Sequence, residues 1–363
     1  MTHTARQVGA LGVSGAGGVA DPLRIGVLGA ARITEPALVV PAREASTRIV
    51  AIAARDPARA AAFAERHGVE NVLGSYAEVI ACPEVEAVYN PLPNGWHTPW
   101  NLAAIAAGTH VLAEKPFATD AGEAADVAVA ARHGQVVVME AMHYAFHPVA
   151  RRLLDILSSG EIGELRHVET IFEIPPPPPG DLRWSFPLAG GAVMDVGCYC
   201  LHAQRAVRSW GHGEPVIVEA RAGERAGSPQ VDEWFEAVLR FPTGATGFMW
   251  CGMAGTTRRA TFRITGTDGD VMATDFVNPQ YDDRVIVRAP GGTRAERLGT
   301  RPTYSYQLDA FVAAIRHGAP VLTSADDAIA TMRLIDQCYL SAGLPPRRRS
   351  RIPRDPTPKE GEQ

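Results

Sequence analysis

Short apolar runs alternate with amphipathic stretches along the first half of the chain. The runs lie at 24–28, 49–53, 87–89, 109–113 and 135–139. Each is short, apolar and bounded by glycine, proline or polar residues, which predicts buried strands. Helical patterns fill 57–67, 96–107 and 121–133, and a glycine follows each of them. This alternation predicts a parallel, doubly wound sheet, which binds ligands outside the carboxyl ends of its strands.

The second half has a different pattern. Strand-like runs lie at 165–174, 215–221, 234–241, 246–251, 260–265 and 284–288, and helices are expected at 148–159, 192–209, 304–316 and 326–341. This order predicts an α+β domain built on an open, mostly antiparallel sheet. The five prolines at 175–179 form a loop, either as a rigid spacer or as a lid over a site.

These patterns predict an α/β protein with four parts. A disordered tail over 1–22 precedes a dinucleotide-binding Rossmann domain over 23–145; a substrate-binding and oligomerisation domain over 146–341 follows, and a second disordered tail covers 342–363. The last tail carries Arg347, Arg348, Arg349 and Arg351. We expect this cluster to be solvated, although contact with nucleic acid or a neighbouring subunit is an alternative.

Composition narrows the class of protein. The chain has 363 residues, 46% of them hydrophobic and 21% charged, with a net charge of −5. This indicates two folded domains and favours neither a nucleic acid nor a membrane as partner. No apolar run approaches the roughly 20 residues of a membrane span. Five cysteines, an odd number without the spacing of a zinc site, favour reduced thiols and a cytoplasmic location.

Two glycine-rich stretches are candidates for binding nucleotide phosphates. GVSGAGG at 12–18 neither follows a strand nor opens a helix, so we assign it to the tail. IGVLGAARI at 25–33 does both. Gly26 and Gly29 permit a tight turn and the close approach of a pyrophosphate, although Ala31 stands where a second glycine is usual. A purely structural turn is the alternative.

The end of the second predicted strand bears on the choice of cofactor. A carboxylate that binds the ribose 2′-hydroxyl is expected there, but the sequence has Ala53 and Ala54, followed by Arg55. An arginine at this place can pair with a 2′-phosphate, which favours NADP over NAD. Asp56 is interpreted as the cap of the next helix, with ribose binding as the alternative.

Several stretches occur together in a recognisable order. They are LGAARI, RDPARAAAFAERHG, VYNPLPNGWHTPW, GTHVLAEKPFATD, MEAMHYAFHP, GEIGELRHVE and GGAVMDVGCYCLH. The chain resembles the Gfo/Idh/MocA oxidoreductase family over about residues 24–340, most of all its dihydrodiol dehydrogenase and xylose dehydrogenase branch. The resemblance implies a Rossmann domain, an open-sheet substrate domain, tightly held NAD(P), and hydride transfer at a carbinol carbon. It also implies homodimers or homotetramers formed through the exposed sheet face, unless loops of the chain cover that face.

The resemblance places most of the cofactor contacts in the loops after the strands. These contacts are Gly29, Ala31, Arg32, Ile33, Arg55, Pro91, Leu92, Asn94, His97, Glu114 and Lys115. Glu114 either holds ribose hydroxyls or orients Lys115. In the loop after the prolines, Arg183 and Trp184 are candidates for contact with a sugar face or an anionic group of the substrate.

Lys115 stands in the run E-K-P at the predicted carboxyl edge of the sheet. Pro116 restricts the backbone there, and the corresponding bond is cis in the resembling family. A lysine near nicotinamide and a substrate hydroxyl stabilises a forming alkoxide or lowers the pKa of a neighbouring acid. The alternative is a strand-end lysine that reaches into solvent.

Asp195, Tyr199 and His202 are spaced by four and three residues, so they share one face of a predicted helix. The resemblance makes the tyrosine the proton donor or acceptor, with Lys115 beside it and the aspartate lining the site. A phenol with a pKa near 10 needs that lysine to work near neutrality. His202 is the second choice as base, and a core tyrosine with a satisfied hydroxyl is the alternative for Tyr199.

Glu140, His143 and His147 also have helical spacing, from which a zinc site can be drawn. We expect no metal, because the resembling family in general binds none at this crossover between domains. The chain departs from the family at Ala145, where arginine is common, and this puts in doubt an ion pair and part of the substrate pocket.

Together these features predict an NADP-preferring dehydrogenase that acts on a sugar, a polyol or a cyclic diol. Tyr199, assisted by Lys115, would take the hydroxyl proton while the hydride passes to nicotinamide. Two alternatives stay open. One is a non-catalytic dinucleotide sensor, and the other is a glycoside hydrolase that uses bound NAD for transient oxidation.

Overall fold

The computed structural model describes residues 21–349 and contains two sheets. The first sheet has six strands in the order β3-β2-β1-β4-β5-β6, and every neighbouring pair is parallel. The strands are β1 (Leu23–Leu28), β2 (Thr47–Ala53), β3 (Asn71–Val72), β4 (Ala87–Asn90), β5 (His110–Ala113) and β6 (Val138–Glu140). The strand order reverses between β1 and β4, where doubly wound sheets open a crevice for ligands.

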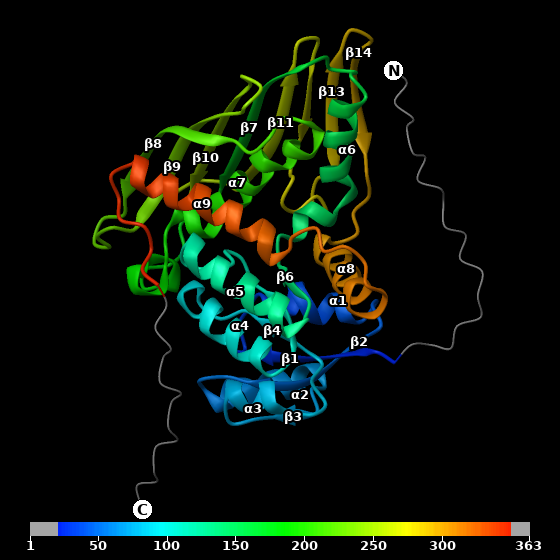
Figure 1. Cartoon of the computed structure of the whole chain (residues 1–363), viewed down its shortest axis with the longest axis vertical. Coiled ribbons are helices and arrows are strands. Elements are labelled where there is room, and N and C mark those ends of the chain that lie inside the picture. The colour runs from blue at the N-terminus through cyan, green and yellow to red at the C-terminus, as the bar shows by residue number, and fades with distance from the viewer. Residues whose placement is uncertain (1–20, 350–363) are drawn as a thin grey trace, which may run out of the picture.

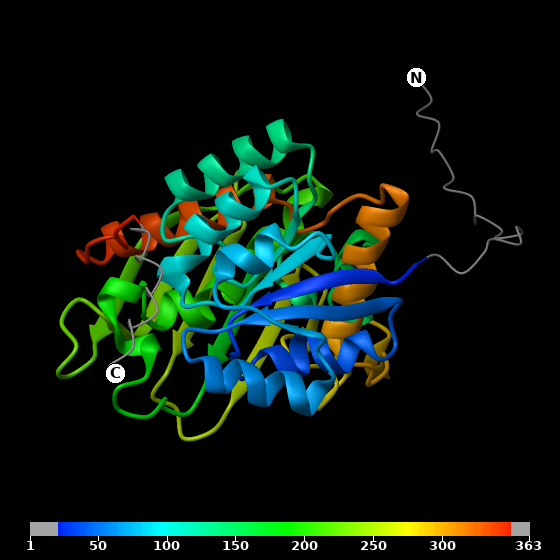
Figure 2. The ribbon, with the colours of Figure 1, turned by 90° about the horizontal axis from the view of Figure 1, so that it is seen from below.

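Helices connect these strands. They are α1 (Val40–Ala42), preceded by a π-helical turn at Glu35–Val39, then α2 (Pro57–His67), α3 (Tyr76–Ala81), α4 (His97–Ala106) and α5 (Ala121–Gly134). The caps follow from the sequence: Asp56 accepts from the N–H of Ala58 at the start of α2, and Gly68, with φ of 70°, ends it. Figure 2 shows these helices on both sides of the strands, as expected for a doubly wound sheet.

The second sheet has eight strands in the order β14-β13-β12-β11-β7-β10-β9-β8. They are β7 (Leu165–Glu173), β8 (Val216–Glu224), β9 (Asp232–Arg240), β10 (Thr246–Gly252), β11 (Arg259–Gly266), β12 (Asp270–Ala273), β13 (Arg284–Ala289) and β14 (Gly292–Arg297). All neighbours are antiparallel except β7 and β10. Helices α6 (Pro148–Ser158) and α7 (Cys198–Arg205) pack against this sheet. The expected mostly antiparallel sheet is confirmed.

The last two helices return to the first domain. In α8 (Thr303–His317), Leu308 and Phe311 are buried in one core with Ile25 and Tyr89 of the first sheet. Helix α9 (Ala325–Ser341) runs beside α5 between the two halves of the molecule (Figure 1). Helix α8, which the domain expected at 146–341 includes, therefore packs on the first sheet, and a helix from the distant end of the chain covers an apolar face of that sheet.

The sequence pattern did not predict some of the elements. Strands β3, β12 and β14 and helix α3 are short or polar, so their periodicity is weak. The helix expected at 192–209 has three parts, a π-helical turn at Val193–Gly197, α7, and a 3-10 turn at Ala206–Trp210. Within residues 21–349, no helix is both long and apolar enough to cross a bilayer.

The tail expected over 342–363 is wrong in its first part. Arg347 is fully buried and pairs with Asp232 at 2.5 Å, while its Nε donates to the carbonyl of Gly190 at 2.8 Å. Its guanidinium also lies 4.1 Å from the ring centroid of Tyr339. A buried carboxylate thus holds an arginine that the sequence pattern placed in solvent. GVSGAGG at 12–18 and Arg351 lie outside the described residues.

Candidate active site

A cleft of about 810 Å³ opens where the carboxyl ends of the parallel strands face the second domain. All of the predicted site residues line it except His202 and Trp184. It also contains residues that the sequence analysis did not assign, among them Arg59, Tyr76, His143, Phe172, Ile174, Asp181, Val277, Asn278 and Tyr304. The cleft is thus formed by loops of the first domain on one side and by the second domain on the other.

The turn after β1 forms one end of the cleft. Gly29 has φ of 104°, a conformation that side chains disfavour, and a Cβ there would lie 3.1 Å from Cδ2 of Leu92. This glycine turn, at the point where the strand order reverses, fits the pyrophosphate of a dinucleotide. Gly26 has a different role, because a Cβ there would lie 2.5 Å from Cγ1 of Val79. Its missing side chain serves helix packing.

Arginines gather at the end of β2. Arg55, just before the N-cap of α2, lines the cleft. Arg59, in the first turn of α2, lines it too and donates from Nη2 to the carbonyl of Ala30 at 2.7 Å. The carboxylate of Asp56 caps α2 through Oδ1 at 3.0 Å. This end of the cleft is therefore cationic.

His97 fixes the loops around the E-K-P run. Its Nδ1 lies 2.8 Å from the carbonyl of Pro116 and its Nε2 lies 2.7 Å from the carbonyl of Leu92. Burial lowers the pKa of His97 to about 4. The Lys115–Pro116 bond is cis, as the resemblance implied. His97 lines the cleft, but both of its ring nitrogens face the protein backbone.

Glu114 and Asn94 also make protein contacts. Oε1 of Glu114 accepts from the hydroxyl of Tyr89 at 2.7 Å, and Oε2 accepts from the N–H of Lys115 at 3.2 Å. Burial raises the pKa of Glu114. Asn94 donates to the carbonyl of Ala189 at 3.0 Å and so connects the two domains. The contact with the backbone of Lys115 agrees with one of the two roles expected for Glu114, the orientation of Lys115.

Lys115, Asp195 and Arg183 form a line of charges across the cleft. Nζ of Lys115 lies 3.2 Å from Oδ1 of Asp195, and Nε of Arg183 lies 2.9 Å from Oδ2 of the same carboxylate. Nη1 of Arg183 also pairs with Asp181 at 3.2 Å, in the loop after the prolines. The loop expected to be a spacer or a lid is thereby connected to the lysine through Arg183.

These contacts keep both partners of the central pair charged. Burial acts to raise the pKa of Asp195, but Lys115 and Arg183 outweigh it and hold the pKa below its usual value. Burial acts to lower the pKa of Lys115, but Asp195 outweighs it and raises the pKa. Lys115 is therefore a cation throughout the neutral range, with only 16% of its side chain exposed. It can stabilise negative charge on a substrate oxygen in the cleft.

Tyr199 faces the same cleft. Its ring centroid lies 5.2 Å from Nζ of Lys115, so the ammonium group and the phenol are neighbours. Its hydroxyl lies 2.9 Å from Nε2 of His143. Burial raises the pKa of Tyr199 well above 10. The two groups on which the predicted chemistry depends therefore meet, but the phenol needs a stabilising partner before it can ionise.

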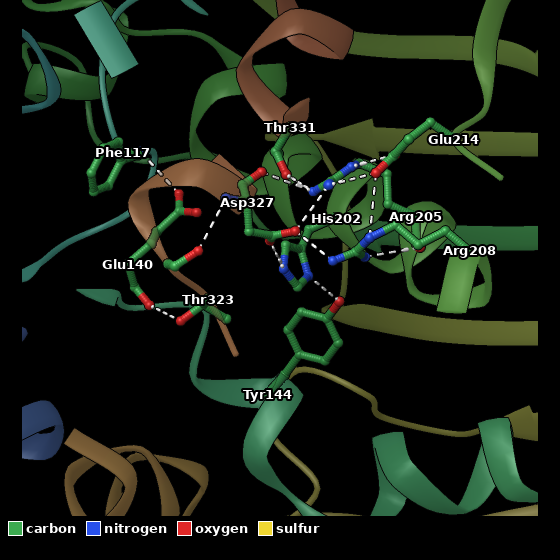
Figure 3. Close-up of polar contacts among 11 residues, drawn as sticks. Phe117, Glu140, Tyr144, His202, Arg205, Arg208, Glu214, Thr323, Asp327 and Thr331 are labelled. Carbon is green, nitrogen blue, oxygen red and sulfur yellow. Dashed lines mark hydrogen bonds and ion pairs between the residues drawn. The ribbon is translucent and has the colours of Figure 1, made fainter. Parts of the chain in front are cut away.

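His202, predicted as the second choice of base, is not among the residues that line the cleft. Nδ1 accepts from the hydroxyl of Tyr144 at 2.6 Å, and Nε2 donates to Asp327 at 3.1 Å. Asp327 also binds Arg205 at 2.9 Å and Arg208 at 2.5 Å (Figure 3). Tyr144 lies between the two side chains, with its ring centroid 6.1 Å from that of Tyr199 and 5.5 Å from that of His202, so His202 is one ring further from the cleft.

Trp184 is likewise absent from the described lining of the cleft. Only 6% of it is exposed, its Nε1 donates to the carbonyl of Pro177 at 3.2 Å, and the guanidinium of Arg225 lies 4.0 Å from a ring centroid of the indole. The hydrogen bond to Pro177 connects Trp184 to the loop of prolines at 175–179. The neighbouring Arg183 does line the cleft.

The three residues considered as zinc ligands each contact a different part of the protein. Glu140 accepts from the N–H of Phe117 at 3.0 Å (Figure 3), His143 binds Tyr199, and His147 caps α6 by accepting from the N–H of Val149 at 3.1 Å. Among residues 21–349 no group of three or more such side chains is placed to hold a metal ion. None of the five cysteines, all within that range, forms a disulfide.

Comparison with known proteins agrees with the fold and the cleft. Residues 23–142 match a model described as an oxidoreductase family with an NAD-binding Rossmann fold, and residues 150–272 match one described as the GFO/IDH/MocA C-terminal domain. The chain is 34% identical over 324 residues to D-xylose 1-dehydrogenase (NADP(+)) 2 of Haloferax volcanii, covering 88% of this chain and 97% of that protein.

Two further relatives are informative. The trans-1,2-dihydrobenzene-1,2-diol dehydrogenase of Sus scrofa is 31% identical over 253 residues, covering 67% of this chain and 73% of the relative. A 3-ketoreductase from Actinomadura kijaniata, solved with NADP and TDP-benzene, has a TM-score of 0.82 at 28% identity, covering 88% of this chain and 98% of that one.

Proposed function

The chain belongs to the Gfo/Idh/MocA family of NAD(P)-binding oxidoreductases, and from this premise we propose that it catalyses an NADP-dependent dehydrogenation in which Tyr199, assisted by Lys115, transfers the proton. The substrate is a sugar, a polyol or a cyclic diol, oxidised at a CH–OH group. The single observation that carries the proposal is that Lys115, Asp195 and Tyr199 line the same cleft as the glycine turn at Gly29.

NADP fits the cationic end of the cleft better than NAD. Arg55 and Arg59 offer guanidinium groups to a 2′-phosphate, and the neighbouring carboxylate of Asp56 is used to cap α2. The relatives in Haloferax volcanii and Actinomadura kijaniata are an NADP(+) enzyme and a protein solved with NADP. We therefore assign NADP as the preferred cofactor, held by the turn after β1 and by these arginines.

The cofactor supplies the hydride acceptor, and the chain supplies the proton chemistry. Lys115 stabilises negative charge on the substrate oxygen, and Asp195 orients Lys115 through Oδ1. Tyr199 accepts the hydroxyl proton in oxidation and returns it to the carbonyl oxygen in reduction. Arg183, bound to both Asp195 and Asp181, keeps the loop after the prolines over the substrate.

A relative supports this pair of residues. Solved structures of the Actinomadura kijaniata 3-ketoreductase include a tyrosine-to-phenylalanine mutant and a lysine-to-alanine mutant. The two mutated positions are separated by the same number of residues as Lys115 and Tyr199. We take this equal spacing as support for the assignment of both residues.

The cleft walls favour a small substrate with one apolar face. Phe172, Ile174 and Val277 form an apolar wall, whereas Lys115, Asp195 and Asn278 offer polar groups. Such a combination suits a sugar ring or a cyclic diol. The TDP ligand of the ketoreductase makes a nucleotide sugar the larger candidate to test.

Reduction of NADP and NAD, followed at 340 nm with aldoses, polyols, cyclic diols and nucleotide sugars, tests the proposal. We expect reduction with at least one of them and faster turnover with NADP. Lys115→Met should reduce kcat by about 10²-fold or more while cofactor affinity changes little. Cleavage of a glycoside without net cofactor reduction, or cofactor binding without turnover, would instead favour the hydrolase or the sensor.

Other features support our proposals for the oligomeric state and the cellular location. Val216, Val218 and Val238 are exposed on strands β8 and β9, and an apolar sheet surface of this kind supports a homodimer or homotetramer. Unpaired cysteines fit a reducing compartment such as the cytoplasm. Light scattering at several protein concentrations tests the assembly, and a monomer at every concentration would contradict it.

A further inference from the structure

We propose that His143 is a positioning residue that donates a hydrogen bond from Nε2 to the oxygen of Tyr199 and so stabilises the phenolate. This inference rests on the proposed function of Tyr199. It goes beyond the lysine–tyrosine pair, because it assigns a third residue that holds the phenol in its reactive form.

The imidazole is held from three sides. Its Nε2 lies 2.9 Å from the hydroxyl of Tyr199, and its Nδ1 lies 2.7 Å from Oγ1 of Thr303. The ring of Tyr304 lies against it with centroids 4.0 Å apart. Only 1% of His143 is exposed, although it lines the cleft. The segment before α6, the first turn of α8 and α7 therefore all fix the position of this ring.

The imidazole stays neutral at this place. Burial lowers the pKa of His143 to about 3, and Lys115 and Arg258 act in the same direction. A neutral imidazole carries one N–H, so each hydrogen bond must be assigned a direction. A threonine hydroxyl can donate to Nδ1, which leaves the N–H on Nε2 to point at Tyr199.

This tautomer leaves the phenol ready for reaction. If Nε2 donates to the phenol oxygen, the hydroxyl hydrogen of Tyr199 is free to point into the cleft toward a substrate oxygen. In reduction that proton goes to the carbonyl oxygen, and the phenolate left behind accepts from Nε2 until a proton from water restores it. In oxidation the phenolate takes the proton of the substrate hydroxyl. The opposite tautomer would direct the only phenol proton into the wall.

In the part of the chain that the structure describes, the other groups near Tyr199 do not fill the role that we propose for His143. Lys115 faces the ring with its charge, but its Nζ bonds to the carbonyl oxygen and the carboxylate of Asp195 at 2.8 and 3.2 Å. Burial is the main cause that raises the pKa of the phenol, and Tyr304, Glu114, Cys198 and Asp195 act in the same direction. Arg258 faces His143 and pairs with Asp275. Among the described residues, the hydroxyl of Tyr199 has its hydrogen bond to His143.

Kinetics against pH with the substrate found in the panel test the inference. His143→Leu should lower kcat by about 10²-fold near neutrality and move the half-maximal pH of kcat upward by about one unit or more. KM should change by less than about threefold, because the imidazole contacts Tyr199 rather than the substrate. His143→Gln, whose amide can donate in place of Nε2, should restore most of kcat. Thr303→Val should shift the profile in the same direction by less.

A matched control lies four residues along the chain. His147 is also fully buried, but its Nδ1 caps α6, so His147→Leu should lower stability and leave the pH profile of kcat unchanged. Identical profiles for wild type and both His143 variants would overturn the inference and leave the proposed function intact. A shift caused equally by His147→Leu would also overturn it.

Nitrogen NMR of the protein with labelled histidine needs no substrate. We expect the neutral tautomer of His143 with hydrogen on Nε2 between pH 5 and 9, lost in Thr303→Val. Hydrogen on Nδ1 instead would overturn the inference. If the wild type turns over nothing in the panel, the proposed function fails, whereas the tautomer still decides whether His143 donates to Tyr199.

Discussion

Residues of the helical segment from Val193 to Arg205 take part in two clusters of charged groups, one at the cleft and one between helices. The front cluster, Lys115, Asp195 and Arg183, lines the cleft. The rear cluster consists of His202, Arg205, Arg208, Glu214 and Asp327, and it joins α7 to α9 (Figure 3). Both clusters pair arginine with aspartate, and they differ in what surrounds them.

The two clusters differ in how exposed their side chains are and in whether their charged groups have protein partners for all of their hydrogen bonds. In the rear cluster Arg205 is 2% exposed and its guanidinium is bound by Glu214, Asp327 and Thr331. In the front cluster Arg183 is 41% exposed and Lys115 faces the cleft. A saturated, buried cluster can hold elements together but has no group left for a ligand. We therefore expect the catalytic chemistry proposed above in the incomplete cluster.

Asp327→Asn gives the largest effect on stability. The substitution removes the negative charge that pairs with buried Arg205, so the free energy of unfolding should fall by about 3–5 kcal/mol. Measured by denaturant titration beside kcat, this variant should retain turnover within about threefold. A stable variant with abolished turnover would show that the rear cluster takes part in the chemistry.

Asp195→Asn should show the opposite pattern. Lys115 and Arg183 lose the carboxylate that orients them, so kcat should fall by about 10²-fold. The cleft admits water to both cations, so the free energy of unfolding should change by no more than about 1.5 kcal/mol. A loss of stability comparable to that of Asp327→Asn would remove the distinction between the clusters.

Arg183→Gln should have a smaller effect. Arg183 contacts Asp195 and Asp181. It acts on Lys115 through Asp195, whereas Asp195 contacts Lys115 directly. We expect kcat/KM to fall by about tenfold, which corresponds to about 1.4 kcal/mol. Arg221→Gln is a matched control, since Arg221 is exposed on β8 and pairs only with glutamates of the second sheet among the described residues. An equal loss in both variants would contradict the role of Arg183.

The sequence predicted the front cluster better than the rear one. Lys115 follows a strand whose position was evident from its apolar pattern, and the resemblance placed Asp195 and Tyr199 opposite it. The rear cluster depends on Asp327, which lies far along the chain from His202 and Arg205. Contacts between distant segments are not encoded in local periodicity. His202 was therefore predicted beside Tyr199, from its helical spacing, although its ion-pair partner is Asp327 of the rear cluster.

The same limit explains the other differences. Strands β1, β2, β4 and β5 and helix α2 were predicted closely, because their pattern and caps are local. The return of α8 to the first sheet and the burial of Arg347 against Asp232 depend on long-range packing. His143 was recognised only as a possible metal ligand, since its partner Thr303 comes from the start of α8.

Glu140→Gln probes a buried carboxylate that contacts the segment after Lys115 and is influenced by Asp327 of the rear cluster. Oε1 of Glu140 accepts from the N–H of Phe117, two residues after Lys115, and burial together with the charge of Asp327 raises the pKa of Glu140 to about 8. In the unfolded chain this pKa is about 4.3. Between these values the folded state binds more protons, so the contribution of Glu140 to stability is full below the lower pKa and declines as pH rises.

Since glutamine does not titrate, the variant should gain stability relative to wild type by about 1.4 kcal/mol for each pH unit between pH 5 and 7. Denaturant titrations at several pH values measure this slope. Glu86→Gln should show the opposite sign, because the hydrogen bond from Arg316 lowers the pKa of Glu86 and its contribution is lost as pH falls. A flat difference for Glu140→Gln would mean that Glu140 is ionised beside Asp327, and that the rear cluster tolerates a second buried carboxylate.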